Sequence, residues 1–478
     1  MSAAIEQDNL DNWRSHEALA ERMIPLIGAL YREHDVILYC FGRKLARESA
    51  VGILRAHRFA RQITGHELLV TSTFPLIEAM SGMDLDSAKI DVGKLAADFT
   101  ETNDDIATFL TSRLSDVMTG NGRLLSEPTD VVLYGFGRIG RLLTRILIDR
   151  VGSGAKLRLR AIVLRPGGEE DLLKRASLLR RDSIHGPFDG TITVDQENSR
   201  IIANGNPIQI IYANSPAEID YTSYGIDNAI VVDNTGSWRD EEGLSKHLES
   251  TGVSRVLLTA PGKGDLKNII FGVNHGTIED SDRIISAASC TTNAIVPVLK
   301  VMSDTFGINS GHVETVHSYT NDQNLTDNFH KKERRGRSAP LNMVITETGA
   351  AKAVVKALPE LAGKLTGNAI RVPTPNVSLA ILNLNLGQAT NKEALNARLR
   401  EASLSPELRE QIDFTASVEV VSSDLVGAER ASIVDSAATI VDGDRAVLYV
   451  WYDNEAGYSY QVVRVIQHLA GLLYPLVG

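Results

Sequence analysis

The fold is decided where an apolar run meets a glycine-rich turn, at Val131-Val132-Leu133-Tyr134-Gly135-Phe136-Gly137-Arg138-Ile139-Gly140. The apolar run predicts a buried strand, and the residues from Arg141 to Asp149 continue as a helix. Gly135 allows the tight turn, Gly137 lets a pyrophosphate approach the backbone, and Gly140 lets the helix pack on the strand. In this setting the motif predicts a dinucleotide site; the alternative is an ordinary glycine turn. The expected cofactor contacts are Gly135, Phe136, Gly137, Arg138, Ile139 and Gly140.

The second apolar strand, Leu159 to Leu164, should end where the ribose of the adenosine lies. In NAD-binding proteins an acidic residue at this point accepts hydrogen bonds from the 2′-hydroxyl. This chain has Arg165 there, followed by Pro166-Gly167-Gly168. Because a guanidinium pairs well with a phosphate, Arg165 favours NADP over NAD. A solvated loop arginine is the alternative interpretation.

The texture of the sequence changes near residues 120–129, where glycines, an asparagine and a proline predict a boundary. Before it, apolar residues recur at helical spacing and predict an all-α region. After it, strand-like runs alternate with helical stretches, which is typical of a mostly parallel α/β sheet. Those runs are Asp130 to Tyr134, Leu157 to Leu164, Ile208 to Tyr212, Ala229 to Asp233 and Val256 to Thr259. Beyond residue 290, longer runs of period two predict an antiparallel sheet.

Composition limits the class of protein. The 478 residues carry 49 Lys and Arg against 60 Asp and Glu, a net charge of −11, which argues against nucleic-acid and membrane-surface binding. A chain of this length should hold two or three domains. Cys40 and Cys290 are too few for a disulfide framework and suit a reducing compartment. The first residues carry no signal-like segment, and no uncharged run approaches about 18 residues, so we expect a cytoplasmic protein.

Cys290 lies in Ser289-Cys290-Thr291-Thr292-Asn293, before a predicted helix from Thr292 to Val301. A sulfur at a helix N-terminus has its thiolate stabilised by the peptide dipoles, so we expect a lowered thiol pKa. His317, in Thr315-Val316-His317-Ser318-Tyr319-Thr320, is the candidate base. Cys290 and His317 are therefore the candidate catalytic pair. A buried, inert cysteine is the alternative.

Taken in order, five motifs make residues 129–478 resemble phosphorylating glyceraldehyde-3-phosphate dehydrogenase. They are the glycine motif, Ser289-Cys290-Thr291-Thr292-Asn293, His317-Ser318-Tyr319-Thr320-Asn321-Asp322-Gln323, Arg371-Val372-Pro373-Thr374-Pro375-Asn376-Val377-Ser378 and Trp451-Tyr452-Asp453-Asn454-Glu455. The resemblance implies oxidation of glyceraldehyde 3-phosphate to 1,3-bisphosphoglycerate, reversibly, in glycolysis or gluconeogenesis. It implies a thiohemiacetal and then a thioester on Cys290, with His317 as base and oxyanion donor. NADP or NAD is the implied cofactor, and no metal is required.

The same resemblance implies roles for further residues. Thr320 and Arg371 would hold the substrate phosphate, with Asp322 orienting Arg371. The attacking phosphate would bind at Ser289, Thr291, Thr348 and Gly349. Thr259, Asn454 and Tyr458 would contact the cofactor, Asn454 at the nicotinamide carboxamide. The basic segment 324–340 matches a loop that packs between subunits, so a homotetramer is implied.

The resemblance implies a Rossmann-type dinucleotide-binding domain at 129–289, completed by a C-terminal helix within 454–478, and an α+β catalytic domain with an antiparallel sheet at 290–453. The family's core enzyme lacks residues 1–128, whose role is open between regulation and assembly. Within that region the spacing of Arg43, Lys44, Arg47, Arg55, Arg58 and Arg61 suggests a basic helical stripe. Two other functions stay open, oxidation of erythrose 4-phosphate and a regulatory binding protein on a dehydrogenase scaffold.

Overall fold

The computed structural model describes residues 2–120, 124–125, 127–150 and 157–478, with side chains from Gln7 onward. Within the predicted boundary at 120–129, residues 121–123 and 126 lie outside the described residues. By internal contacts the chain forms two compact units. The first takes in residues 1–128 and Gly471–Gly478, and the second takes in Thr129–Arg150 and Leu157–Ala470.

The first unit combines helices with a small sheet. Its helices are α1 (Ser2–Glu33), α2 (Ala50–Phe59), α3 (Arg61–Thr64), α4 (Val70–Met80), α5 (Val92–Thr100) and α6 (Ile106–Arg113). Its strands are β1 (Val36–Cys40), β2 (Arg43–Lys44), β3 (Ala88–Asp91) and β22 (Leu476–Val477), in the order β2-β1-β3-β22. Met23 and Ile27 of α1 and Ile77 of α4 belong to its core, as does Cys40.

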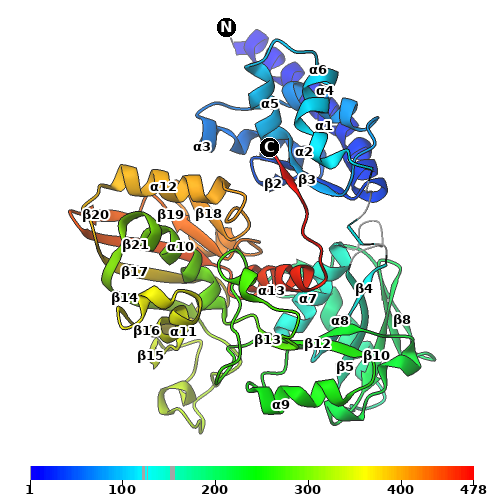
Figure 1. Ribbon diagram of the computed structural model, residues 1–478, viewed down its shortest axis with the longest axis vertical. Helices are drawn as coiled ribbons and strands as arrows, with labels where there is room; N and C mark the ends of the chain where they lie inside the picture. The colour runs from blue at the N-terminus through cyan, green and yellow to red at the C-terminus, as the bar shows by residue number, and fades with distance from the viewer. Residues whose placement is uncertain (1, 121–123, 126, 151–156) are drawn as a thin grey trace. The chain divides into compact units, whose positions relative to one another are not determined.

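The prediction of an all-α region is therefore wrong for the sheet. The β-branched and aromatic run Val36–Cys40 forms a strand because it pairs in parallel with β3, which pairs in parallel with β22 from the other end of the chain. Figure 1 shows this C-terminal strand, in red, beside the blue strands. The predicted single basic stripe is also wrong, because its six residues are divided among β2, the following loop, α2 and α3.

The dinucleotide-binding sheet of the second unit has eight strands in the order β13-β12-β11-β4-β5-β10-β9-β8. These are β4 (Thr129–Tyr134), β5 (Leu157–Leu164), β8 (Ile192–Asp195), β9 (Arg200–Ala203), β10 (Asn206–Tyr212), β11 (Ala229–Asp233), β12 (Val253–Leu258) and β13 (Ile284–Ser286). The strands from β13 to β10 are parallel, as predicted, and β9 and β8 are antiparallel additions. Helices α7 (Arg138–Asp149), α8 (Asp171–Arg180) and α9 (Glu241–Ser245) connect its strands, and a short pair, β6 (Arg181–Asp182) and β7 (Gly186–Pro187), follows α8.

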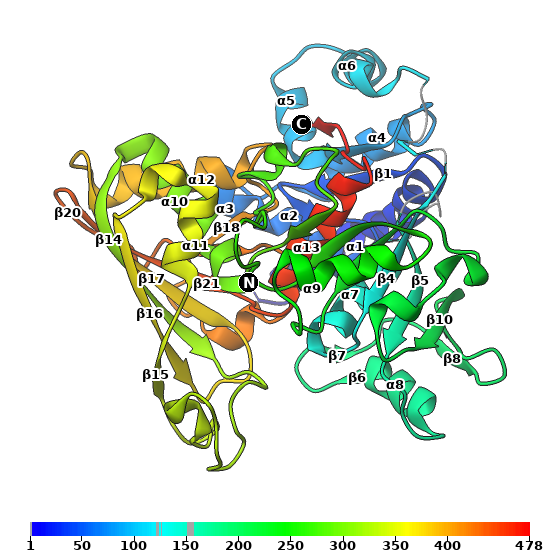
Figure 2. The same cartoon turned by 60° about the horizontal axis from the view of Figure 1, so that its bottom comes forward.

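The second sheet of this unit has the order β15-β16-β14-β17-β21-β19-β18, with β20 paired to β21. The strands are β14 (Ile308–Ser318), β15 (Val344–Glu347), β16 (Leu365–Val372), β17 (Ser378–Leu386), β18 (Ile412–Thr415), β19 (Ser432–Asp435), β20 (Ile440–Asp442) and β21 (Arg445–Tyr452). It is mostly antiparallel, but β14 runs parallel to β16 and β18 to β19. Figure 2 shows α10 (Cys290–Phe306), α11 (Ala350–Ala357) and α12 (Lys392–Leu404) along this sheet.

Helix α13 (Ala456–Leu469) follows β21 and packs against α7 beside the glycine motif. Its buried residues include Tyr458 and Val462. The helix predicted for this part of the chain ends at Leu469, and the residues that follow lead to β22.

Candidate active site

Cys290 is the first residue of α10, so its sulfur lies at the N-terminal end of that helix. The helix begins two residues earlier than predicted and is capped by Ser289, whose side chain accepts a hydrogen bond from the Thr292 N–H at 3.1 Å. His317 lies near the end of β14, with Nε2 3.6 Å from the Cys290 sulfur. The fold therefore brings the candidate nucleophile and the candidate base together.

The electrostatics of this pair differ from the expectation. Burial raises the pKa of the Cys290 thiol above its ordinary value, and it outweighs the opposing effects of the Arg371 charge and of hydrogen bonds at the helix start. The expected net lowering is therefore wrong for the ligand-free protein. Burial, reinforced by the Arg371 charge, lowers the pKa of His317 to about 3. The imidazole is consequently neutral at physiological pH.

Arg371 holds the other side of the imidazole. It lies on β16, where it pairs with His317 across the parallel β14 and β16 strands. Its Nη1 donates to the Ser318 carbonyl at 3.1 Å and lies 2.8 Å from His317 Nδ1. The same carbonyl lies 2.7 Å from His317 Nδ1, so Nδ1 either donates to this carbonyl, which leaves Nε2 to accept a proton, or accepts from Arg371 Nη1.

Asp322 does not contact Arg371 as expected. Its carboxylate pairs with Arg335, because the short turn Glu333–Gly336 brings that arginine back to the segment that follows β14. Arg335 also donates to Thr346 Oγ1 at 3.2 and 3.3 Å, and the charge of Arg371 helps to lower the pKa of Arg335. Two guanidinium groups therefore lie close to His317. Sequence reasoning placed Arg335 only in a basic loop segment and missed this position.

The hydroxyl groups expected to bind phosphate come from several elements. Ser289 Oγ and Thr292 Oγ1 are 2.7 Å apart, and Thr348 Oγ1 accepts from the Ala350 N–H at the start of α11. Gly349 is the N-cap residue of α11 and has no side-chain cap. Thr320 is partly exposed, two residues beyond the end of β14.

Tyr452 is a second residue that sequence reasoning missed. Its buried hydroxyl lies 3.0 Å from Thr291 Oγ1 and 2.6 Å from Thr315 Oγ1, and its ring stands edge-on to His317. Burial raises the pKa of this phenol, so it stays protonated and can donate only one hydrogen bond at a time. The Trp451-Tyr452-Asp453 motif was the available signal.

The glycine motif has the geometry that a dinucleotide requires. Gly135 has a φ of 103°, and a Cβ at Gly140 would lie 2.5 Å from the Gly135 carbonyl oxygen. Around the place of a Cβ at Gly137 nothing lies within 4 Å, so a pyrophosphate can approach the backbone at the start of α7. These residues fit the cofactor.

Several of the remaining expected cofactor contacts already have partners within the protein. Arg138 pairs with Asp182 and Glu455, and Phe136 is buried. Ile139 is partly buried. Thr259 Oγ1 donates to the Asp233 carbonyl at 3.0 Å. Asn454 Oδ1 accepts from Ser378 Oγ at 2.9 Å, which leaves its N–H groups available to a carboxamide oxygen. Tyr458 Oη donates to the Ala288 carbonyl at 2.9 Å, two residues before Cys290.

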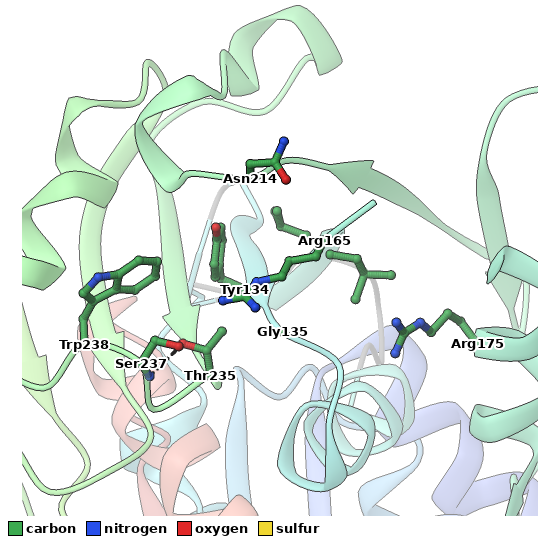
Figure 3. A pocket seen from close by; sticks show the side chains of 10 residues that line it. Tyr134, Gly135, Arg165, Arg175, Asn214, Thr235, Ser237 and Trp238 are labelled. Carbon is green, nitrogen blue, oxygen red and sulfur yellow. Dashed lines mark hydrogen bonds between the residues drawn. The ribbon is translucent and has the colours of Figure 1, made fainter. Parts of the chain in front are cut away.

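A cavity of about 370 Å³ opens beside Gly135 (Figure 3). Its lining residues are Tyr134, Gly135, Val163, Leu164, Arg165, Arg175, Asn214, Thr235, Ser237 and Trp238. Arg165 comes directly after β5 and is exposed, as the sequence predicted for the ribose end of the site. The lining includes two arginines and no carboxylate.

Comparison with known families now decides the assignment. The NAD binding domain of glyceraldehyde 3-phosphate dehydrogenase matches residues 129–241, and its C-terminal domain matches residues 289–454. The chain belongs to the glyceraldehyde-3-phosphate dehydrogenase family. The resemblance drawn from the five motifs is thereby confirmed, and with it an oxidoreductase that acts on an aldehyde and uses a nicotinamide dinucleotide.

Relatives of the dehydrogenase differ in how much of the chain they share. A glyceraldehyde-3-phosphate dehydrogenase-like protein of Pseudomonas aeruginosa is 62% identical over 95% of this chain and 99% of its own length. Glyceraldehyde-3-phosphate dehydrogenase 1 of Bacillus subtilis is 39% identical over 71% of this chain and 98% of its own length. Chloroplastic glyceraldehyde-3-phosphate dehydrogenase GAPA1 of Arabidopsis thaliana is 40% identical over 80% of this chain and 93% of its own length. The family domains begin at residue 129, and of these three relatives the Pseudomonas aeruginosa protein is the one that matches nearly the whole chain.

Within the described residues, no helix is long and apolar enough to cross a membrane. In the same part of the chain, His, Cys, Asp and Glu side chains form no cluster able to hold a metal ion.

Proposed function

We propose that this protein is a phosphorylating glyceraldehyde-3-phosphate dehydrogenase that prefers NADP to NAD and works through a thioester on Cys290. The observation that carries the proposal is the 3.6 Å approach of His317 Nε2 to the Cys290 sulfur. A thiol beside a neutral imidazole whose Nε2 can accept a proton suits nucleophilic attack on an aldehyde.

The residues present can carry each proton and bond change. The Cys290 sulfur attacks the aldehyde carbon, and its proton passes through His317 Nε2 to the carbonyl oxygen, which gives a thiohemiacetal. Nε2 takes back the hydroxyl proton as that carbon is oxidised to a thioester. When bound, the nicotinamide supplies the acceptor for the hydride released. A phosphate oxygen then attacks the thioester carbon, the C–S bond breaks, the Cys290 thiolate recovers the proton held on Nε2, and the acyl phosphate is released.

Phosphate binding is supported by the two guanidinium groups beside His317. Burial lowers the pKa of Arg335 and the nearby charge of Arg371 lowers it further, so an anion bound beside the two cations would be stabilised. Thr320 lies near the substrate phosphate in this proposal, and Ser289, Thr291, Thr348 and Gly349 near the attacking phosphate. Because Asp322 pairs with Arg335, it orients that arginine.

The preference for NADP is supported by the charge of the cavity beside Gly135. Its lining holds no carboxylate to accept hydrogen bonds from the 2′-hydroxyl of NAD, and Arg165 follows directly after β5. Losing one charge-assisted contact costs about 1.5–3 kcal/mol, or roughly 10- to 100-fold in affinity. We therefore expect Arg165→Asp to lower kcat/KM for NADP by about that factor and to move preference toward NAD.

Steady-state kinetics with NAD, NADP, NADH and NADPH test the whole proposal. We expect glyceraldehyde 3-phosphate to be oxidised in a phosphate-dependent reaction, faster with NADP, and Cys290→Ser to abolish turnover while nucleotide binding persists. Preference for NADPH would favour the gluconeogenic direction in a cytoplasmic enzyme. Turnover without phosphate dependence, activity retained by Cys290→Ser, or a higher kcat/KM with erythrose 4-phosphate would contradict the proposal.

We also propose assembly as a homotetramer. The segment that follows β14 exposes large apolar side chains, among them Phe329 at 91% and Leu341 at 80%. Such side chains gathered on one segment are typical of an interface between subunits. Light scattering on the eluting protein should give four times the chain mass of 52.0 kDa, and a monomer would contradict it.

A further inference from the structure

Arg175 lines the same cavity as Arg165 but comes from a different element, helix α8. Its only hydrogen bonds within the described residues run from Nε to the carboxylate of Asp171, at 3.2 and 3.3 Å. Both terminal nitrogens of the guanidinium have no hydrogen-bond partner in the part of the chain that the structure describes. Figure 3 shows the group directed from α8 toward the space in front of Gly135.

The Asp171 carboxylate that accepts from Arg175 also accepts a hydrogen bond from a second residue. Asp171 Oδ2 accepts a hydrogen bond from the Tyr212 hydroxyl at 3.1 Å, at the end of β10. Asp171 lies four residues before Arg175 on the same helix, and its side chain is only 15% exposed. It does not line the cavity. The carboxylate therefore fixes Nε and leaves the outer edge of the guanidinium facing the ligand space.

A fork held in this way suits a phosphate group. The terminal nitrogens of a guanidinium can donate to a phosphate in the bidentate geometry that makes such pairs strong. A phosphate monoester carries about −1.5 to −2 charges at pH 7, so one arginine alone would leave it partly uncompensated. Arg165 has no ion-pair or hydrogen-bond partner within the described residues and can supply the second cation.

We propose that Arg175 is a second specificity-determining residue, which binds the 2′-phosphate of NADP together with Arg165 while Asp171 and Tyr212 hold its guanidinium in position. This inference rests on the proposed preference for NADP. It adds that the preference comes from α8 as well as from the end of β5, so replacing Arg165 alone leaves part of it in place.

The experiment measures the affinities of 2′,5′-ADP and 5′-AMP by calorimetry, since the two probes differ only in the 2′-phosphate. The wild type is compared with Arg175→Gln, Arg175→Lys, Arg165→Gln and Lys174→Gln. Lys174 is the matched control, because it is the neighbouring cation on α8, is highly exposed and pairs with Glu170 outside the cavity.

We expect Arg175→Gln to lower the affinity ratio of 2′,5′-ADP to 5′-AMP by about tenfold, which corresponds to one charge-assisted contact, while the affinity for 5′-AMP stays within about twofold. Arg175→Lys should retain an intermediate ratio, because a lysine keeps the charge and loses the fork. Lys174→Gln should leave the ratio unchanged.

Three results would overturn the inference. An unchanged ratio in Arg175→Gln beside a lowered ratio in Arg165→Gln would remove Arg175 and leave the NADP preference standing. An equal loss for both probes would show a structural or pyrophosphate role. A wild type that binds both probes equally would remove the NADP preference and this inference together.

Discussion

Replacing Tyr474 by phenylalanine should loosen the first unit of the chain specifically. The Tyr474 hydroxyl donates to the buried carboxylate of Asp35 at 2.9 Å, just before β22 joins β3. Phenylalanine keeps the ring, which lies 5.6 Å from the Lys89 ammonium, and removes only the hydroxyl. The substitution therefore isolates one contact between the C-terminal segment and the remainder of this unit.

The size of the effect follows from the kind of bond that is lost. A hydrogen bond to a charged group contributes about 1.5–3 kcal/mol, and about 1.4 kcal/mol changes an equilibrium constant tenfold. The constant for opening the β3 and β22 pair should thus rise by roughly 10- to 100-fold. Hydrogen exchange of the Lys89 amide reports this opening directly, because that amide donates to the Pro475 carbonyl at 2.9 Å.

Hydrogen exchange read by mass spectrometry on peptides covering residues 85–97 is the assay. Leu473→Ala is the control, since Leu473 is the preceding residue and its side chain is 49% exposed. Exchange should accelerate in Tyr474→Phe and remain near the wild-type rate in Leu473→Ala. If Tyr474→Phe exchanges within twofold of the wild type, the C-terminal strand does not stabilise this unit in solution and the reasoning fails.

Three further predictions concern chemistry and domain independence. His317→Asn should lower turnover by about 10² to 10⁴, the usual scale of general acid–base catalysis, with Cys290 still reactive to iodoacetamide at high pH; an unchanged turnover would make His317 merely structural. Because burial raises the pKa of the Cys290 thiol, the rate of its alkylation should still increase as the pH rises above 9. Arg371→Gln removes a cation that opposes this shift, so it should move the pH profile of alkylation to higher pH. An alkylation rate that levels off below pH 8 would contradict the raised pKa. A chain covering residues 126–470 should keep turnover. A chain covering residues 126–478 should be less soluble, because Leu472 and Tyr474 lose the unit that buries them. A folded 126–470 protein without turnover would show that the first unit takes part directly in catalysis.

Much of the dinucleotide-binding sheet could be predicted, because its signals are local. Strands β4, β5, β10 and β11 are apolar runs that follow or precede clear turn residues. The sheet of the first unit could not be predicted in the same way. Its strands have two to five residues, and β22 reaches β3 from the other end of the chain. Long-range pairing of short strands leaves little periodicity to detect.

In the candidate site, too, the features set by local sequence could be predicted and those set by long-range contacts could not. Contiguous motifs placed Cys290 at the start of a helix and His317 near the end of a strand, and the fold brings the two together. The partner of Asp322 depends on how the loop that carries Arg335 folds back, which no motif encodes. The pKa of Cys290 has the same origin, because a helix dipole can be anticipated from sequence whereas the desolvation that outweighs it depends on neighbours from other elements.

The position of β22 also has a consequence for how the chain folds. Strand β22 is synthesised after every other element described, yet it completes the edge of a sheet whose remaining strands lie before residue 92. Until it arrives, β3 presents unpaired backbone groups at that edge, and Asp35 lacks the Tyr474 hydroxyl. The first unit is therefore the earliest to emerge and among the last to be completed. Completion of this unit therefore has to wait for synthesis of α13, the helix whose Tyr458 donates a hydrogen bond to the Ala288 carbonyl, two residues before Cys290.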